Sequence, residues 1–355
     1  MNKTKKYFFL SRLMAMGLVM GGVLAANTTY AESIFEYLTP TADSSPAGLA
    51  FDSKGNLWFA EVNGNKIGKL TPSKVKPGTS DGIVEYELPH ANSKPQYLMV
   101  SRDDIVWFSE MGGNRIGRLD PETGIIREYN IPTPNSEPHH LFESKDRKIW
   151  FTEFEANKIG RLDPLMGEIK EFTVNEGHPH DLVVDDEYVW YTQGGKFWAK
   201  IFANKIGYLE LESGKVGEIV IPPKKSVPHG MSLASDGTIW FTQFFAGKIS
   251  RLDFSEEFPP KVVDYQIPGK RTGAHDLVVD YNKRWVWFVA NHKDSIGKLD
   301  LTAADPEAGI QLFPLPTKGA HPSNLVLDKE GNVWFTEMGM YFRGRYQNKI
   351  GKLVP

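Results

Sequence analysis

The sequence contains no cysteine among its 355 residues. This absence excludes structural disulfides, thiol chemistry and a lipoprotein anchor, so an exported form of the chain must be stabilised by its packed core alone. Positive charge is not in excess either, since 41 Lys and Arg are outnumbered by 44 Asp and Glu. A nucleic-acid-binding protein is expected to carry a basic stripe, and we therefore expect no nucleic-acid partner.

Sustained helical patterns are missing after residue 31, and the most distinctive apolar run lies before it. Leu13–Ala25 follows four basic residues and precedes Thr29-Tyr30-Ala31, a small-residue cleavage site. The run is too short to span a membrane comfortably, so it predicts a secretory signal peptide over residues 1–31, with an uncleaved anchor as the alternative. The four positive charges lost with it take the net charge from −3 to −7. We expect an exported protein, periplasmic or extracellular, without membrane contact after cleavage.

The chain does contain one pattern in seven copies, each marked by a tryptophan. These are Trp58, Trp107, Trp150, Trp190, Trp240, Trp287 and Trp334. Their gaps of 40 to 50 residues are typical of stacked repeats. Within each copy, turn residues separate four short runs that are rich in β-branched and aromatic residues. The sequence therefore predicts an all-β fold, a seven-bladed β-propeller with four antiparallel strands per blade. Tandem sandwiches, the alternative, would need repeats of about 100 residues.

The two ends of the mature chain are predicted to complete one blade. The last copy, His321–Pro355, stops after its third strand, while Ile34–Pro40 (IFEYLTP) matches the fourth-strand sequence Ile83–Pro89 (IVEYELP). We expect the N-terminal strand to pair into the last blade, because closure removes an exposed sheet edge. Residues 32–355 would then form a single propeller domain, which we expect to be monomeric.

Histidines gather at the start of the first strand of each copy. This first strand should line the channel of the propeller. Because successive strands alternate in direction, the start of strand one, the end of strand two and the start of strand three should share one face. At the aligned position the copies carry Ala47, Gln96, His139, His180, His229, His275 and Ser323. His178 and His321 lie two residues earlier in copies four and seven. Neighbouring imidazoles suit metal binding or acid–base chemistry, and the alternative is that they only satisfy backbone groups.

Carboxylates and amides form a second predicted ring on the same face. Three residues after each tryptophan stand Glu61, Glu110, Glu153, Gln193, Gln243, Ala290 and Glu337. The third copy carries Glu137 and Glu153 on either side of His139, where a carboxylate can orient an imidazole or hold a divalent cation. His180, His275 and Glu153 are therefore the candidate metal ligands. For each of these glutamates, a solvated turn acid is the alternative.

Two insertions are predicted on this face, Gly194–Ala203 in the fourth copy and Gly339–Gln347 in the seventh. They carry aromatic and arginine residues, which are typical of ligand-binding walls. The candidate ligand-binding residues are Phe197, Trp198, Tyr341 and Arg343, together with His178 and His321. The alternative is that the loops pack back on their own blades.

The phrases D-G-x-I-W-F-T-E, N-K-I-G-R-L and I-x-E-Y-x-I-P-T-P resemble those of the streptogramin B lyase (virginiamycin B lyase) family over the whole mature chain. The resemblance implies a propeller that opens a cyclic depsipeptide antibiotic by metal-assisted elimination. It implies a P-H histidine as general base, with glutamates and Mg²⁺ polarising the ester. Glu137-Pro138-His139 matches the family's E-P-H phrase and Pro228-His229-Gly230 its P-H-G phrase. His139, His229 and Glu137 are therefore the candidate catalytic residues.

The chain departs from that family in its run of four aligned histidines, in Pro46-Ala47-Gly48 where a P-Y-G phrase is expected, and in its export signal. Three functions remain open. The first is an exported, metal-assisted carbon–oxygen lyase acting on a cyclic ester or lactone, with Mg²⁺ implied by the resemblance. The second is a protein whose histidines hold a transition metal. The third is a non-catalytic propeller that binds a peptide or glycan. In each case the partner is a small-molecule or peptide-like ligand.

Overall fold

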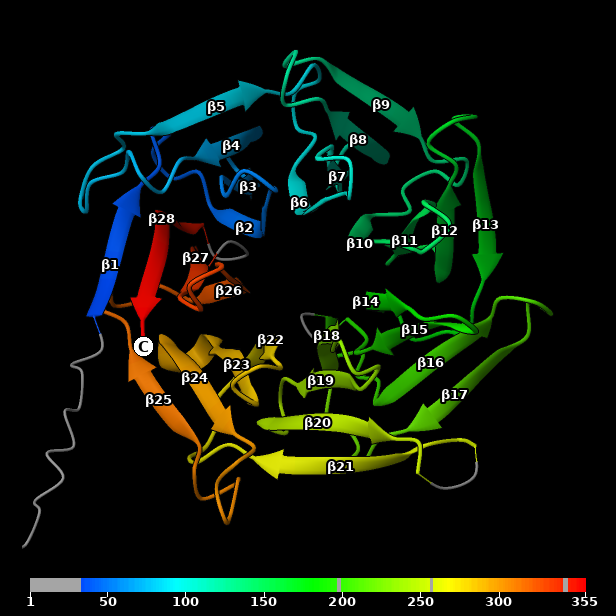
Figure 1. Ribbon diagram of the computed structural model, residues 1–355. Helices are drawn as coiled ribbons and strands as arrows, with labels where there is room; N and C mark the ends of the chain where they lie inside the picture. Colours follow the sequence, from blue (N-terminus) through cyan, green and yellow to red (C-terminus); the bar gives the residue numbers. More distant parts are fainter. Residues whose placement is uncertain (1–32, 197–198, 256–257, 341–343) are drawn as a thin grey trace, which may run out of the picture. The chain divides into compact units, whose positions relative to one another are not determined.

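A computed structural model describes residues 33–196, 199–255, 258–340 and 344–355. The chain divides into Met1–Ala31 and a second unit, Glu32–Pro355, to which the described residues belong. This unit consists of seven four-stranded antiparallel sheets arranged around a common centre (Figure 1). The predicted all-β, seven-bladed propeller is confirmed. No helix within the described ranges is long and apolar enough to cross a membrane.

Each blade has four strands, which follow one another from the centre of the ring outward (Figure 1). The innermost strands are β2 (Pro46–Phe51), β6 (Pro95–Val100), β10 (Pro138–Glu143), β14 (Pro179–Val184), β18 (Pro228–Leu233), β22 (Ala274–Asp280) and β26 (Pro322–Leu327). The second strands are β3 (Leu57–Glu61), β7 (Val106–Glu110), β11 (Ile149–Glu153), β15 (Tyr188–Gln193), β19 (Ile239–Gln243), β23 (Trp285–Ala290) and β27 (Val333–Met340). The third strands are β4 (Lys66–Leu70), β8 (Arg115–Leu119), β12 (Lys158–Leu162), β16 (Lys205–Glu210), β20 (Lys248–Asp253), β24 (Ser295–Asp300) and β28 (Arg345–Val354). The outermost strands are β5 (Ile83–Glu87), β9 (Ile126–Asn130), β13 (Ile169–Thr173), β17 (Val216–Val220), β21 (Lys261–Gln266), β25 (Gln311–Pro314) and β1 (Ser33–Leu38). A 3-10 turn, η2 (Asn291–Lys293), follows β23.

Blades are numbered one to seven in the order of their innermost strands, and the seventh contains both ends of the described chain. β1 pairs antiparallel with β28, so that Ile34 lies opposite Leu353 and Tyr37 opposite Ile350. The Tyr37 ring stacks on Trp334 with centroids 5.6 Å apart. The N-terminal strand therefore completes the last blade, which is the pairing predicted from the match between Ile34–Pro40 and Ile83–Pro89.

The repeated aromatic and glycine residues pack the interior of each blade. In blade 3, Phe151 is fully buried and its ring lies over Gly160 on the next strand. A Cβ at Gly160 would come within 2.1 Å of that ring, so glycine makes room for the phenyl group. The neighbouring Trp150 packs on Phe172 of the outermost strand, with centroids 5.6 Å apart. The tryptophans thus belong to the core, as the sequence pattern predicted.

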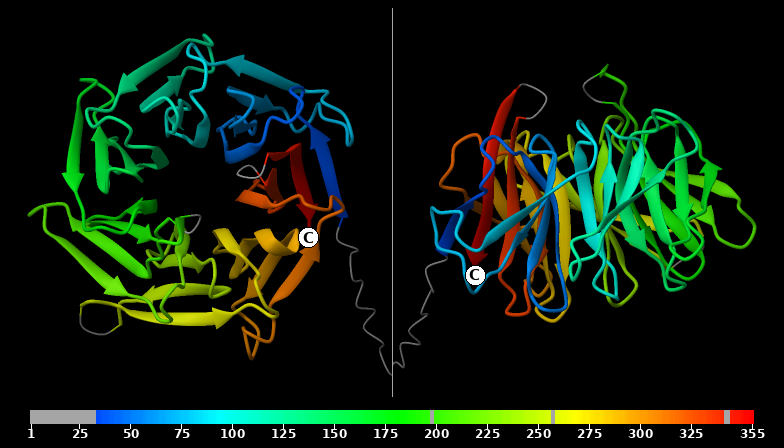
Figure 2. Two further views of the ribbon diagram at one scale, coloured as in Figure 1. Left: turned by 180° about the vertical axis from the view of Figure 1, so that it is seen from behind. Right: turned by 90° about the horizontal axis from the view of Figure 1, so that it is seen from above.

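Every innermost strand carries a β-bulge directly after its first residue. In β10 the pairing register with β11 shifts between Pro138 and Leu141, which leaves His139 and His140 in the bulge. The same shift occurs in the other six innermost strands. A bulge interrupts the strict alternation of side chains along a strand and re-aims them. Two consecutive residues of each blade can therefore lie at the centre of the ring. Figure 2 shows the ring of blades from behind and from above.

Candidate functional site

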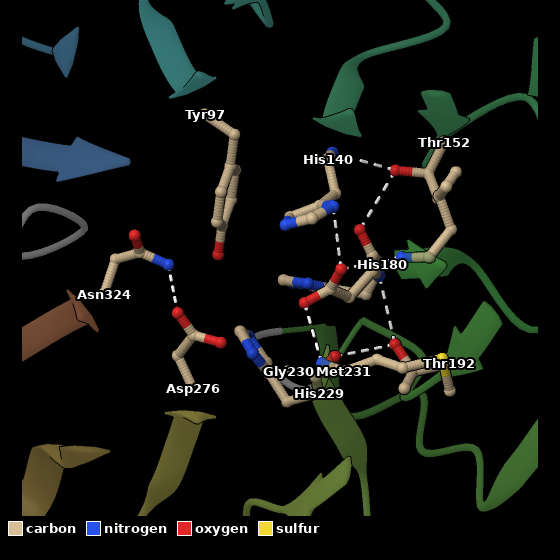
Figure 3. Close-up of polar contacts among 12 residues, drawn as sticks. Tyr97, His140, Thr152, His180, Thr192, His229, Gly230, Met231, Asp276 and Asn324 are labelled. Atoms are coloured by element: carbon tan, nitrogen blue, oxygen red, sulfur yellow. Dashed lines mark hydrogen bonds and ion pairs between the residues drawn. The ribbon is translucent and has the colours of Figure 1, made fainter. Parts of the chain in front are cut away.

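The seven bulges bring two rows of side chains to the centre of the ring. The first row is the one that the sequence alignment predicted: Ala47, Gln96, His139, His180, His229, His275 and Ser323. The second row consists of the residues that follow them: Gly48, Tyr97, His140, Asp181, Gly230, Asp276 and Asn324. Figure 3 shows Tyr97, His140, Asp276 and Asn324 pointing toward one another from four different blades. We call the four aligned histidines of the first row the imidazole row.

The imidazole row is a continuous series of ring contacts across blades 3 to 6. Ring centroids lie 4.1 Å apart between His139 and His180, 3.8 Å between His180 and His229, and 4.0 Å between His229 and His275. The first three of these residues are at most 8% exposed. The structure therefore brings together four of the histidines that the sequence predicted for catalysis or metal binding.

Burial keeps these imidazoles uncharged. It lowers the pKa of His139 to about 3 and that of His275 to about 4. Burial, followed by the repulsion from neighbouring histidines, also holds the pKa values of His180 and His229 well below the usual range. Desolvation disfavours the charged form of a base, and like charges at short range add to the effect. All four rings are therefore neutral near pH 7.

Backbone contacts determine which nitrogen of two of these rings carries the proton. Nδ1 of His229 lies 3.0 Å from the carbonyl oxygen of His275, and Nδ1 of His275 lies 2.7 Å from that of Ser323. A carbonyl oxygen can only accept a hydrogen bond, so each Nδ1 must carry the hydrogen. Nε2 of His229 and of His275 is then the unprotonated nitrogen, which is the state that a general base requires.

A histidine–aspartate pair lies in the second row. Nδ1 of His140 is 2.8 Å from Oδ1 of Asp181, an ion-pair contact. The Asp181 carboxylate accepts hydrogen bonds from the amides of Leu182 and Met231, at 2.7 and 2.8 Å. Burial alone would lower the pKa of His140, but the charge of Asp181 and the contact with it raise the value above the ordinary one. The surroundings of His140 therefore favour its protonated form, in contrast to the imidazole row.

Asp276 is the second acid of this row. Burial, together with the nearby charge of Asp181, raises the pKa of Asp276 to about 8. Its carboxyl accepts a hydrogen bond from the side-chain amide of Asn324 and another, at 2.8 Å, from the backbone amide of Leu277. A carboxylic acid that stays protonated near neutral pH can donate a proton, so environment separates the roles of the two aspartates.

Threonines that follow the repeat tryptophan by two residues hold the bulges in place. The hydroxyl of Thr242 accepts a hydrogen bond from the amide of Gly230 at 2.9 Å and donates one to the carbonyl of His275 on the next blade at 3.0 Å. Thr192 makes the same two contacts with the amide of Asp181 and the carbonyl of His229, at 3.0 and 2.7 Å. Each threonine thus links two blades at the residues that bear the imidazoles.

The glutamates of the W-F-T-E phrase do not lie with the histidines. Glu153 is fully buried inside its own blade, where Glu171, Lys158 and Ser136 are its polar neighbours. Lys158 pairs with Glu171 at 2.9 Å, and burial raises the pKa of Glu153 to about 8. Burial has the same effect on Glu61 and Glu337. These carboxyl groups are protonated partners of charged ones. The structure therefore does not bring Glu153 together with His180 and His275, the other two residues of the predicted metal site.

Glu153 therefore lies apart from the two histidines with which the sequence grouped it. The structure also places Glu137 and His178 directly before the innermost strands, where both have a left-handed backbone, with φ of 50° and 55°. Burial and the nearby charge of Glu155 raise the pKa of Glu137, and no contact between its carboxyl group and His139 is found in the described ranges. Nδ1 of His178 lies 2.9 Å from the carbonyl oxygen of Phe154, whose ring packs against His139 and His180.

The remaining predicted ligand-binding residues divide between described and undescribed positions. His321 also precedes its innermost strand with a left-handed backbone, and its Nδ1 lies 3.2 Å from Oδ1 of Asn291. Phe197, Trp198, Tyr341 and Arg343 lie outside the described residues. Their predicted contribution to a binding wall stays a prediction.

A ready-made metal centre is not present at the histidines. Over the described ranges, no group of three or more histidines and acids is arranged to hold a metal ion. Nδ1 of His275 is engaged by the Ser323 carbonyl, and Glu153 lies among residues of its own blade. The residues do not fit a metal held by His180, His275 and Glu153, so we derive no step through a metal. Participation of Mg²⁺ or a transition metal stays a prediction.

Comparison with known proteins shows the family. The model of the virginiamycin B lyase family matches residues 25–197 and 193–353. This chain belongs to that family. The resemblance of the repeat phrases is thereby confirmed. A search of curated proteins gives no match.

Solved structures of virginiamycin B lyases are similar over nearly the whole chain. A streptogramin B lyase structure is 29% identical, covers 91% of this chain and 97% of its own, and superimposes with a TM-score of 0.77. The Staphylococcus aureus virginiamycin B lyase has the same identity and TM-score, with 92% of this chain and 100% of that chain covered. A catalytically inactive form of the S. aureus enzyme with quinupristin matches equally well. Kuenenia stuttgartiensis hydrazine synthase, at 11% identity and a TM-score of 0.68, shares the fold alone.

The sequence did not predict four residues of the site, namely Tyr97, Asp181, Asp276 and Asn324. Each follows the aligned histidine position by one residue. Strict alternation along a strand would turn such a residue away from the ring centre, and the bulge overrides that expectation. The available signal was polarity, because Asp181 and Asp276 follow histidines at the start of otherwise apolar strands.

Proposed function

We propose that this chain is an exported lyase that opens a cyclic ester or lactone by proton abstraction, with the imidazole row and the second row as its site. The observation that carries the proposal is His229, whose ring is neutral and whose Nδ1 is held by the His275 carbonyl. Its Nε2 is left to accept a proton. Family membership supports the reaction class, and the quinupristin complex of the S. aureus relative supports the ligand class.

The proposed reaction is an elimination. Nε2 of His229 takes a proton from the carbon next to the one that bears the ester oxygen. The electron pair of that C–H bond forms a carbon–carbon double bond, the C–O bond breaks, and the ring opens as a carboxylate leaves. No water is consumed. A positioned base of this kind contributes about 10²–10⁴-fold to a rate.

The second row supplies the complementary charge. His140 carries a proton because Asp181 lies beside it, and Asp276 is protonated near pH 7 because it is buried. Either group can donate a hydrogen bond or a proton to the leaving carboxylate oxygen. Titratable groups whose environments push their pKa values apart suit the acid and base roles of one reaction. We assign His229 as the base and the His140–Asp276 side as the acid.

Export belongs to the same proposal. The basic residues, the apolar run Leu13–Ala25 and the Thr29-Tyr30-Ala31 site support secretion of a chain that begins near Glu32. Such an enzyme would meet its substrate outside the cytoplasm. N-terminal sequencing of the protein recovered from periplasm and medium tests this, and an intact Met1 in the cytoplasmic fraction would contradict it.

The test of the reaction is the mass of the product. The protein is incubated with quinupristin, with added Mg²⁺ in one arm and a chelator in the other, and the products are separated by liquid chromatography and weighed by mass spectrometry. Elimination gives a ring-opened product of unchanged mass, whereas hydrolysis adds the mass of one water molecule. A linear product of unchanged mass supports the proposal. Unconverted quinupristin in both arms, or a hydrolysed product, would overturn it.

Two other functions make different predictions in the same samples. A metalloprotein whose imidazole row holds a transition metal should contain that metal when it is purified without a histidine tag and measured by elemental analysis. A non-catalytic propeller should bind the ligand at the imidazole row and release it unchanged. If the chelator abolishes the lyase activity, the reaction is metal-assisted, as the family resemblance implies.

A further inference from the structure

A cavity of about 650 Å³ lies between blades 5 and 6, at the opposite end of the innermost strands from the imidazole row. Three other cavities between neighbouring blades are smaller, at about 190, 300 and 340 Å³. The large cavity is lined by the turns after β18 and β22, by Arg251 and Tyr265, and by part of the loop after β24. The channel site plays no part in it.

The repeat residue at one position of this cavity differs from that of blades 1, 4 and 7. Six residues before the tryptophan of blades 1 and 7, and five before that of blade 4, an aspartate accepts a hydrogen bond from the indole N–H. The pairs are Asp52–Trp58, Asp328–Trp334 and Asp185–Trp190, at 2.9, 2.9 and 2.7 Å. Blade 5 has Ala234 at this position, and Ala234 and Trp240 both line the cavity. Nowhere in the described chain does the Trp240 indole N–H find an acceptor.

Two arginines line the same cavity, and Asp253 of the same strand lies within electrostatic range of Arg251. Arg251 lies opposite Trp240 in the pairing of β19 with β20, and Arg284 lies in the turn before β23. Neither forms an ion pair with an acid in the described ranges. Asp236 also lines the cavity, and its Oδ1 accepts a hydrogen bond from the amide of Thr238 at 2.9 Å. The balance of charge therefore favours a ligand with one negative charge over a ligand with two.

Aromatic rings form the rest of the wall. Trp240 and Tyr265 are stacked with centroids 5.8 Å apart, and Tyr281 is 52% exposed at the cavity. Aromatic walls suit a flat ring, and a guanidinium group binds a carboxylate through two parallel hydrogen bonds. The indole N–H of Trp240 is a further donor.

We propose that this cavity binds a small monoanion in which a carboxylate is joined to a flat ring. Arg251 and Arg284 bind the carboxylate, and the ring lies against Trp240 and Tyr281. The site is separate from the imidazole row, so its occupancy does not depend on the proposed lyase reaction. Placing the aspartate of blades 1, 4 and 7 at position 234 should close the site.

The probe is 4-hydroxybenzoate, with the uncharged 4-hydroxybenzamide as its matched control, and binding is measured by calorimetry and by saturation-transfer NMR. We expect the carboxylate to bind and the amide to bind at least tenfold more weakly, because a hydrogen bond to a charged group is lost. Arg251→Gln and Arg284→Gln should each raise the Kd about tenfold or more. Arg118→Gln is the control, since Arg118 lies opposite Trp107 in blade 2 as Arg251 lies opposite Trp240, and lines a smaller cavity.

Ala234→Asp is the decisive variant. It should abolish binding of 4-hydroxybenzoate while its circular dichroism spectrum and thermal midpoint show a folded protein. Arg284→Gln changes an exposed turn residue, so it tests the proposal even if Ala234→Asp fails to fold. No binding of 4-hydroxybenzoate to the unmodified protein, equal binding of the amide, or unchanged binding in Arg251→Gln and Arg284→Gln would each overturn the proposal.

Discussion

Nδ1 of His229 lies 3.0 Å from the carbonyl oxygen of His275 on the neighbouring blade. The contact crosses the boundary between two repeats, and the hydroxyl of Thr242 also donates to that carbonyl. Because the carbonyl can only accept, it selects the His229 tautomer whose Nε2 is bare. The orientation of the proposed base therefore depends on how blade 5 packs against blade 6.

The first prediction concerns the protonation of the imidazole row. His229 and His275 should remain neutral well below pH 6.5, since burial lowers the pKa of both. The unfolded chain binds protons on these rings where the native state does not, so they destabilise the protein as the pH falls below about 6.5. NMR titration of the ring protons measures the pKa values. If both rings titrate near the ordinary histidine pKa, the imidazole row is not held neutral by burial.

His140 should behave in the opposite way. Asp181 raises its pKa, so Asp181→Asn should lower that pKa toward or below the ordinary value. The same NMR titration checks this prediction, with Asp236→Asn on the other end of the strands as the matched control. An unchanged His140 pKa in Asp181→Asn would show that the ion pair does not determine its charge.

A third prediction concerns Glu153, whose role is structural. Burial raises its pKa from about 4.5 to about 8, so the stability that its protonated form contributes is fully present below about pH 4.5 and is lost as the pH rises to about 8. Blades 4 and 5 carry Gln193 and Gln243 at the same position, and both are fully buried. Glu153→Gln should therefore leave the thermal midpoint nearly unchanged at about pH 4.5 and raise it by a few degrees at about pH 9. Equal midpoints at the higher pH, or loss of bound metal, would contradict this assignment.

The closing strand provides a fourth prediction. Without β1, the last blade has three strands and β28 exposes an unpaired edge. A chain beginning at Thr39 should lose most of its thermal stability and aggregate, whereas a chain beginning at Ser33 should not. Differential scanning calorimetry and light scattering compare the two. Equal stability of both chains would show that β1 is dispensable for the ring.

The sequence predicted the number of blades because a tryptophan marks every copy and the ends of the chain share one blade. It also predicted that His139, His180, His229 and His275 lie together, since a ring places equivalent residues of neighbouring blades side by side. The sequence also placed Glu153 beside these histidines, which was wrong. Glu153 pairs with Pro138, next to His139, but its side chain turns into the blade toward Lys158. Asp181 and Asp276 were missed because a bulge has no signature in a strand pattern of alternating residues.

His229 is the proposed base of the lyase site, and the rate of quinupristin opening in His229→Ala is the sharpest test of that role. His90→Ala is the matched control, because His90 is exposed and pairs with Glu128 away from the ring centre. We predict that kcat/KM falls about 10²–10⁴-fold in His229→Ala, with an unchanged thermal midpoint and unchanged metal content, and stays constant in His90→Ala. Retained activity together with a loss of about 1 kcal/mol of stability would contradict it, because His229 would then only satisfy the backbone of its neighbour.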